Sequence, residues 1–308
     1  MKRIALSLFI IGILAFSTPG NVAAFNIPVN LNIGDVFKIR ITNASVEHKI
    51  NGTEYFDTDM PELSQLSVNQ IAEMKITAIY DEGKSTYVNV TGNAGELKIE
   101  GTVEVDEWMF GLGLLLFLIL AQVYFNPDNY DFSAPTDTTI TSVDKIDPLP
   151  IFASSNETQY TELVNKYNSS ETTTTTTTST STNPNITMAE NIFDVNYNSA
   201  EKFFNFTIII DITNHGVNSK GDSWSTHMIY KYITYIDVAR SFVFKYLLEL
   251  KYEVNIGSAS SLAFMSIGWD NSTETQDEGG ILGLPGFELY ISLTALLAVP
   301  IIIKKYRK

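Results

Sequence analysis

The three histidines are the first residues to test for catalytic or metal-binding chemistry. His48, His215 and His227 are scattered through the 308-residue chain, and none belongs to an HExxH motif or forms a close pair. The chain has no cysteine, which removes thiol nucleophiles and cysteine-ligated metal sites. Residues 221–225 (GDSWS) come nearest to a G-x-S-x-G nucleophile elbow but end in serine, and no glycine-rich phosphate loop with lysine occurs. We therefore predict no catalytic residues and no enzymatic activity.

A short stretch of acidic and amide residues raises the question of a calcium site. Asp194, Asn196 and Asn198 follow the first half of the calcium-loop pattern. The sixth position is Ser199 where the pattern needs glycine, and the twelfth is Asn205 where it needs glutamate. The pattern is therefore too incomplete to predict a metal site.

A second acidic cluster precedes the C-terminal apolar segment and consists of Asp270, Glu274, Asp277 and Glu278. A short run of like charges is most simply a solvated stalk. We expect no metal at either cluster, and no motif indicates a cofactor.

Asn-x-Ser/Thr sequons are the most frequent chemical motif in the chain, and each is a candidate for N-glycosylation. They begin at Asn43, Asn51, Asn89, Asn156, Asn168, Asn185, Asn205 and Asn271. None lies in the apolar segment at either end, and three cluster around a threonine-rich tract at 171–185. Such a tract cannot bury a core, so we expect a solvated loop that tolerates glycans.

The N-terminal residues have the three-part layout of a secretory signal peptide. Lys2 and Arg3 form a basic start, residues 4–16 are almost wholly apolar, and small residues stand at the −3 and −1 positions of a cleavage site. We predict cleavage between Ala24 and Phe25, with an uncleaved N-terminal anchor as the alternative.

The C-terminal residues predict a membrane span. Residues 289–303 carry no charge and measure ~23 Å as a helix, and counting from residue 281 makes the segment long enough for a ~30 Å hydrocarbon core. A basic cluster at 304–308 follows directly and would hold the C-terminus in the cytoplasm. The alternative is a buried core helix.

The residues before this segment resemble a known sorting signal. Pro285, Gly286 and Phe287, followed by a short apolar span and a basic end, resemble the PGF-type C-terminal signal of archaeal surface proteins. The resemblance covers only residues 283–308. It implies a sortase-type membrane enzyme that cuts near the motif and joins the new C-terminus to a lipid. The threonine-rich tract lies far upstream of the motif rather than beside it, and Glu288 directly follows the motif. The alternative is therefore that the span is not cut and remains in the membrane.

Charge limits the partners of the exposed part of the chain. The whole chain has 20 basic and 35 acidic residues. Setting aside the six basic residues at the two ends and Glu288 leaves 14 basic and 34 acidic residues between positions 25 and 286. Such a surface repels nucleic acid and anionic lipid headgroups.

The most apolar internal segment is 108–125. As a membrane span it would put the sequons that follow it in the cytoplasm and the basic tail outside, against the positive-inside rule. We therefore expect a buried helix that the rest of the domain covers. The alternative is that it lines a site for a lipid or another apolar ligand.

Period-two alternation of apolar and polar residues predicts β-strands on both sides of that segment. The clearest strands are expected at 72–80, 97–105, 204–213 and 242–256, and further strands at 36–42, 86–91, 228–237 and 262–269. We predict a mainly β fold in which an antiparallel curved sheet or half-barrel packs on the one apolar helix, with a β-sandwich as the alternative.

The predicted organisation has six parts. They are a signal peptide at 1–24, a β-rich part with the apolar helix at 25–170, a Thr-rich linker loop at 171–187, a second β-rich part of the same ectodomain at 188–269, a stalk with the LPGF motif at 270–286, and a transmembrane anchor with a basic tail at 287–308.

The sequence thus predicts a glycosylated protein on the cell surface, anchored in the plasma membrane by its C-terminus. Its expected partners are the membrane, a sortase-type enzyme and an unidentified surface partner, and not nucleic acid. An interaction or cell-envelope structural module is the first hypothesis. A carrier or receptor for a hydrophobic ligand is the second, and a surface hydrolase is the third.

Overall fold

The computed structural model describes most of the region between the two terminal segments. The described residues are 27–55, 66–83, 85–109, 115, 118, 121–122, 125–133, 145–146, 148, 150–167, 177–178 and 185–271.

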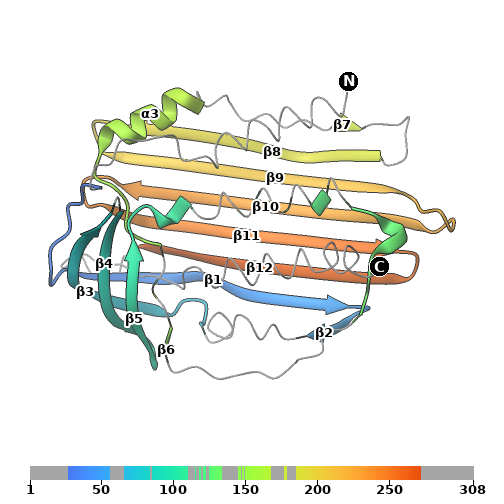
Figure 1. The fold of residues 1–308 in the computed structure, drawn as a ribbon, viewed down its shortest axis with the longest axis horizontal. Helices are drawn as coiled ribbons and strands as arrows, with labels where there is room; N and C mark the ends of the chain where they lie inside the picture. Colours follow the sequence, from blue (N-terminus) through green and yellow to red (C-terminus); the bar gives the residue numbers. More distant parts are fainter. Residues whose placement is uncertain are drawn as a thin grey trace.

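The described chain is mainly β, as the alternation predicts, and its strands belong to one open sheet (Figure 1). The sheet is not curled around the apolar segment, so the prediction of a half-barrel is wrong. The strands are β1 (Val36–Ile50), β2 (Thr53–Tyr55), β3 (Ile71–Glu82), β4 (Ser85–Ala94), β5 (Leu97–Glu104), β6 (Lys145–Ile146), β7 (Thr177–Thr178), β8 (Asn185–Asn198), β9 (Phe203–Val217), β10 (Ser223–Asp237), β11 (Phe242–Ile256) and β12 (Ala259–Asn271). The described helices are the short 3₁₀ turns Glu107–Met109 and Pro127–Asn129 and the helix α3 (Glu157–Tyr167).

The strand order is β6-β5-β4-β3-β1-β12-β11-β10-β9-β8-β7, with β2 paired to β1. Both β-rich parts of the sequence therefore contribute to the same sheet. The predicted linker at 171–187 contributes β7 and the first residues of β8.

The first strand joins the two halves of the sheet. Residues 36–40 of β1 pair with β3, and residues 39–50 pair with β12. The register shifts between Ile41 and Asn43, which marks a bulge near the point where β1 passes from one partner to the other. Beyond this junction, β3, β4 and β5 run at a steep angle to the long strands (Figure 1).

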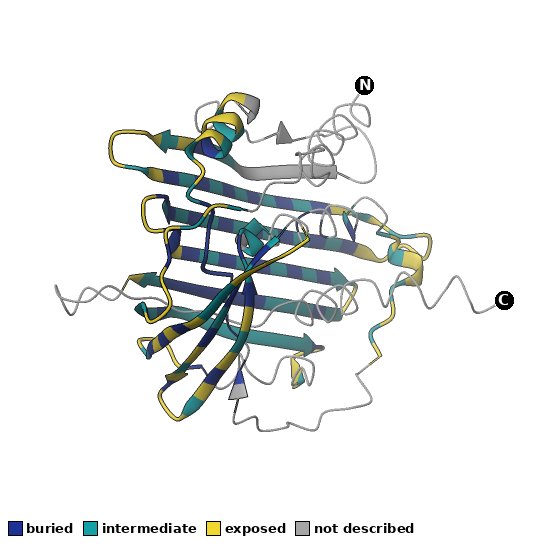
Figure 2. Ribbon diagram, turned by 60° about the vertical axis from the view of Figure 1, so that its left-hand side comes forward, coloured by how far each residue is buried: buried dark blue, intermediate teal, exposed yellow. Residues whose placement is uncertain are grey.

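The long strands β9, β10 and β11 show why the sheet forms. Nearly every second residue is buried along each strand, and the residues between them are half-buried (Figure 2). This is the period-two pattern of a sheet with one covered face and one face toward water. We call the covered face, which carries Phe206, Tyr232 and Leu248, the inner face, and the opposite face the outer face.

One hydrophobic core covers the inner face. It includes inward residues of β3–β5, such as Val88 and Val103, together with inward residues of the long strands. Phe37 of β1 lies against Phe152 and Phe242, with ring centroids 5.9 and 6.1 Å away. Segment 151–153 is held to the start of β11, because Ala153 N donates to Ser241 O and Val243 N to Ile151 O.

The described residues of the apolar segment 108–125 also lie in this core. Leu115, Leu118 and Ala121 are 2%, 1% and 5% exposed. Gln122 accepts a hydrogen bond from Thr226 of β10 over 2.7 Å, and another from Asn214 of β9. The described part of this segment therefore packs against the inner face. None of the described helices is long and apolar enough to cross a membrane.

The helix α3 was not predicted from the sequence. Asn156 caps it, since its Oδ1 accepts the Thr158 amide over 3.1 Å. Tyr160, Leu163 and Val164 recur at helical spacing and pack toward the core. This spacing was the available signal, but it covers only a little more than one turn.

Replacement of Leu118 by Asp should unfold the domain. The side chain is 1% exposed, and a lone carboxylate there would have no partner, which we expect to cost about 4 kcal/mol or more. Urea denaturation of the full chain in detergent, monitored by tryptophan fluorescence, measures the loss in the free energy of unfolding. The matched control is Ile33→Asp at a position that is 67% exposed, where we expect a change within about 0.5 kcal/mol. Equal stability of the two variants would contradict the placement of the segment.

Candidate functional site

Several predicted site residues lie outside the described part of the chain. They are the cleavage pair Ala24 and Phe25, the sorting motif Pro285, Gly286 and Phe287, and the sequon at Asn168. Of the acidic stalk, only Asp270 is described, near the end of β12.

The three histidines lie on three different strands of the sheet. His48 is in β1, His215 in β9 and His227 in β10. His227 Nε2 lies 2.9 Å from Asp211 Oδ1 on the neighbouring strand, which makes a cross-strand pair on the outer face. Within the described ranges, no three His, Asp or Glu residues are grouped as a metal site would require.

The residues of the partial calcium pattern are spread along β8 instead of forming a loop. Asp194 accepts a hydrogen bond from Asn205 Nδ2 over 2.9 Å across the β8–β9 pair. Asn198 Oδ1 accepts the backbone amides of Ala200 and Glu201 and so shapes the β8–β9 turn. These contacts give the pattern a structural role in the hairpin.

The remaining sequons occupy turns, strands and a helix cap. Asn51 lies in the β1–β2 turn at φ 50°, and its Oδ1 accepts the Ser260 amide. Asn156 caps α3, and Asn271 ends β12. Asn43, Asn89, Asn185 and Asn205 are strand residues.

Several side chains with polar groups are buried between the inner face and the segments that cover it. Tyr230, Tyr232, Tyr246 and Tyr252 all point inward from β10 and β11 and are buried. The Tyr246 ring stacks on Trp269 of β12, with centroids 4.3 Å apart. We call these four tyrosines the tyrosine cluster.

The carboxyl of Glu107 lies at one end of this cluster. Burial raises the pKa of Glu107 to about 7, against a weaker opposing hydrogen bond from the backbone of Glu104. Burial also raises the pKa of Tyr246, and neighbouring Tyr232, Tyr230 and Glu107 raise it further. The Tyr246 hydroxyl has no hydrogen-bond partner.

Gln122, a residue of the apolar segment, marks a second polar position. Its Oε1 accepts from both Asn214 and Thr226, while Gln122 Nε2 and Asn214 Oδ1 are buried without a partner. One unpaired donor and one unpaired acceptor thus lie on two side chains that contact each other.

The two positions are separated along β10. Thr234, which pairs with Tyr246, and Thr226 are eight residues apart in β10, or ~26 Å. An unpaired buried polar group costs about 1–3 kcal/mol, so both positions lower the stability of the folded chain unless another group pairs with them.

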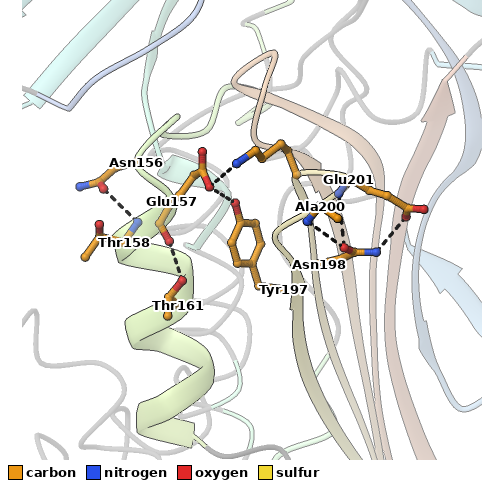
Figure 3. Close-up of polar contacts among 9 residues, drawn as sticks. Asn156, Glu157, Thr158, Thr161, Tyr197, Asn198, Ala200 and Glu201 are labelled. Atoms are coloured by element: carbon orange, nitrogen blue, oxygen red, sulfur yellow. Dashed lines mark hydrogen bonds and ion pairs between the residues drawn. The ribbon is translucent and has the colours of Figure 1, made fainter.

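A third polar cluster joins α3 to the β8–β9 hairpin (Figure 3). Glu157 accepts hydrogen bonds from Lys202 Nζ over 2.6 Å and from Tyr197 OH over 2.9 Å. These bonds, first that of Lys202, lower the pKa of Glu157, while burial and the Glu157 bond raise the pKa of Tyr197 to about 12. A carboxylate held in its charged form by two donors is poorly suited to proton transfer, so this cluster fixes the helix in place.

Sequence reasoning missed Glu107, Gln122 and the tyrosine cluster as possible site residues. Glu107 and Gln122 are the polar residues near the two ends of the apolar segment, and that position was the available signal. The inward tyrosines were recognised only as part of the alternation.

Comparison with known proteins gives no relative, since no family model and no curated protein matches the chain.

Replacement of Glu107 by Gln should remove a pH dependence of stability. The folded-state pKa of about 7 lies above the usual 4.5, so the carboxyl contributes most below pH 4.5, and that stability is lost as the pH rises through 7. The full shift corresponds to about 3 kcal/mol. Urea denaturation at pH 5, 6, 7 and 8 should show that the free energy of unfolding of the wild type falls as the pH rises. In the variant this fall should be smaller, by up to about 3 kcal/mol. Glu96→Gln at an exposed turn is the control, and parallel pH profiles for all three proteins would contradict the burial of Glu107.

Proposed function

We propose that the chain is an exported, C-terminally anchored and glycosylated surface protein whose β domain is an interaction or cell-envelope structural module. Its two apolar ends, its sequons and the acidity of residues 25–286 support this proposal from the sequence. The structural observation that supports the interaction module is the outer face of the long strands, which the described covering segments leave free.

The outer face lies opposite the elements that cover the sheet. Among the described residues, α3 reaches the inner face through Tyr160 and Phe204, whose ring centroids are 4.8 Å apart. The apolar segment reaches the same face at Thr226, and β1 reaches it at Phe242. The long strands therefore offer their opposite side to a partner.

The outer face carries both charge and aliphatic surface. Lys231 Nζ lies 2.7 Å from Glu249 on the next strand, and Lys251 Nζ lies 2.8 Å from Glu253. Beside these pairs, Ile233 pairs in register with Leu247 of β11. Paired charges raise the cost of nonspecific association, and the aliphatic patches between them provide area that a matched partner can bury. A broad, nearly flat surface of this kind favours a macromolecular partner over a small substrate.

The second candidate function is a carrier or receptor for a hydrophobic ligand. The observation in its favour is the set of unpaired polar atoms on Tyr246, Gln122 and Asn214 beneath the apolar segment. In this proposal a ligand would place its polar groups at these atoms and its hydrocarbon against Leu115 and Leu118.

Intact mass spectrometry of the mature protein tests the surface proposal. We expect Phe25 at the N-terminus and, if a sortase-type enzyme acts, a lipid in place of the residues after the sorting motif. Truncation after Gly280 should release a protein that an alkaline wash removes from membranes. A truncated chain that resists the wash would make 108–125 a membrane span and would overturn the proposed topology.

Lipid extraction of the purified protein separates the two functions. If the domain is a carrier, organic extraction should recover a stoichiometric lipid, and Gln122→Leu should reduce its amount because the segment loses its polar contact. If it is an interaction module, neither protein should yield one. Circular dichroism of the variant serves as the folding control, and a bound lipid in the wild type would displace the first proposal.

A further inference from the structure

The side of β3–β5 that faces away from the core presents a pair of stacked tyrosines. Tyr80 of β3 and Tyr87 of β4 are direct partners in the ladder. Their ring centroids are 5.7 Å apart with 21° between the ring planes, and Tyr80 is 41% exposed. An exposed stacked pair is a flat apolar surface at the edge of water, where a partly polar ring can cover it.

A glycosylation sequon follows this pair on the same strand. In β4, residues at every second position share a face, so Tyr87, Asn89 and Thr91 all project from the side of the tyrosine pair. Successive members of this set are ~7 Å apart, which is about the width of one sugar ring. Asn89 and Thr91 are the acceptor and the hydroxyl residue of the sequon.

Hydrogen bonding orients the acceptor amide. Thr102 of β5 donates its hydroxyl to Asn89 Oδ1 over 2.7 Å. Within the described chain, Asn89 Nδ2 makes no hydrogen bond. The oxygen of the amide is thereby fixed toward β5, and the nitrogen that a sugar would take is left available.

The sequon at Asn205 provides an internal contrast. It also lies in the middle of a strand, but its Nδ2 donates to Asp194 over 2.9 Å and its Oδ1 accepts from Thr207 over 3.1 Å. A sugar on this nitrogen would replace one of its two hydrogens beside Asp194 and would stand among the paired charges of the outer face. Asn89 and Asn205 therefore differ in the hydrogen bonding of the one atom that matters for modification.

We propose that Asn89 carries an N-linked oligosaccharide whose first ring packs on Tyr87 and Tyr80, an inference that rests on the proposed export of the chain. In the attachment step Asn89 Nδ2 loses one proton and bonds to the anomeric carbon of a phosphate-activated oligosaccharide. The bond from that carbon to the phosphate oxygen breaks, and the phosphate leaves with the electron pair. The sugar then covers the exposed tyrosine faces with its C–H groups.

Peptide mass spectrometry of the full chain, produced in a cell that exports and N-glycosylates proteins, tests the attachment. Trypsin releases residues 85–98, in which Asn89 is the only sequon, and residues 203–220, in which Asn205 is the only one. We expect the first peptide to carry the glycan and the second to be unmodified. Thr91→Ala should abolish the modification of the first peptide.

Two outcomes separate this inference from the proposed function. Glycans at other sequons with Asn89 unmodified would overturn the inference and leave the surface proposal standing. A chain with no glycan and an intact N-terminus would overturn both.

The packing of the sugar is tested with Tyr87→Thr, which keeps the strand and the sequon. We expect Asn89 still to be modified, and the upfield ring-current shift of the first sugar's protons, seen by NMR in the wild type, to disappear. Enzymatic removal of the glycan should lower the melting temperature of the wild type by about 2 °C more than that of the variant. Identical sugar spectra in the two proteins would overturn the packing.

Discussion

The need to cover the apolar inner face of the long strands determines most of this structure. Strands β9 to β12 each carry a row of large apolar side chains that point inward, and a sheet with such a face cannot remain uncovered in water. The apolar segment, segment 151–153, α3 and the β3–β5 end of the sheet supply the cover, and their buried residues form one core with the strands. The core therefore links parts of the chain that are far apart in sequence. Removal of any one covering segment would expose apolar side chains of the strands and of the remaining segments to water.

Polar atoms within this core limit how the covering segments can sit. Gln122 is bonded to β9 and β10, Glu107 lies beside the tyrosine cluster, and Asp106 accepts the Ser154 amide and the Gln159 side chain. Apolar contacts alone are non-directional, whereas these hydrogen bonds specify a register. Their cost is an inner face with unpaired polar groups at Tyr246 and Asn214.

The two faces of the sheet differ in burial and in charge. The inner face is filled by the core, while the outer face carries charges paired across strands, as with Lys231 and Glu249. On the smaller strands the exposed surface is different in character, with the stacked Tyr80 and Tyr87 beside uncharged Asn89 and Thr102. The proposed protein partner would therefore need matched charges, whereas the proposed sugar would contact aromatic faces.

Alternation alone determined that this chain is mainly β and which residues point inward, because a side chain's face in a strand depends only on its position in the strand. The burial of Leu115 and Leu118 likewise follows from the apolar composition of their segment. Strand pairing was decided by the tertiary structure. Ile41 pairs with Trp269, and all the described strands join one sheet where the sequence had left a sandwich open. Alternation specifies a face but not a neighbour. For the same reason the polar contacts of Gln122 with Asn214, and of Glu157 with Lys202, could not be predicted, since each joins residues that only the folded sheet brings within hydrogen-bond distance.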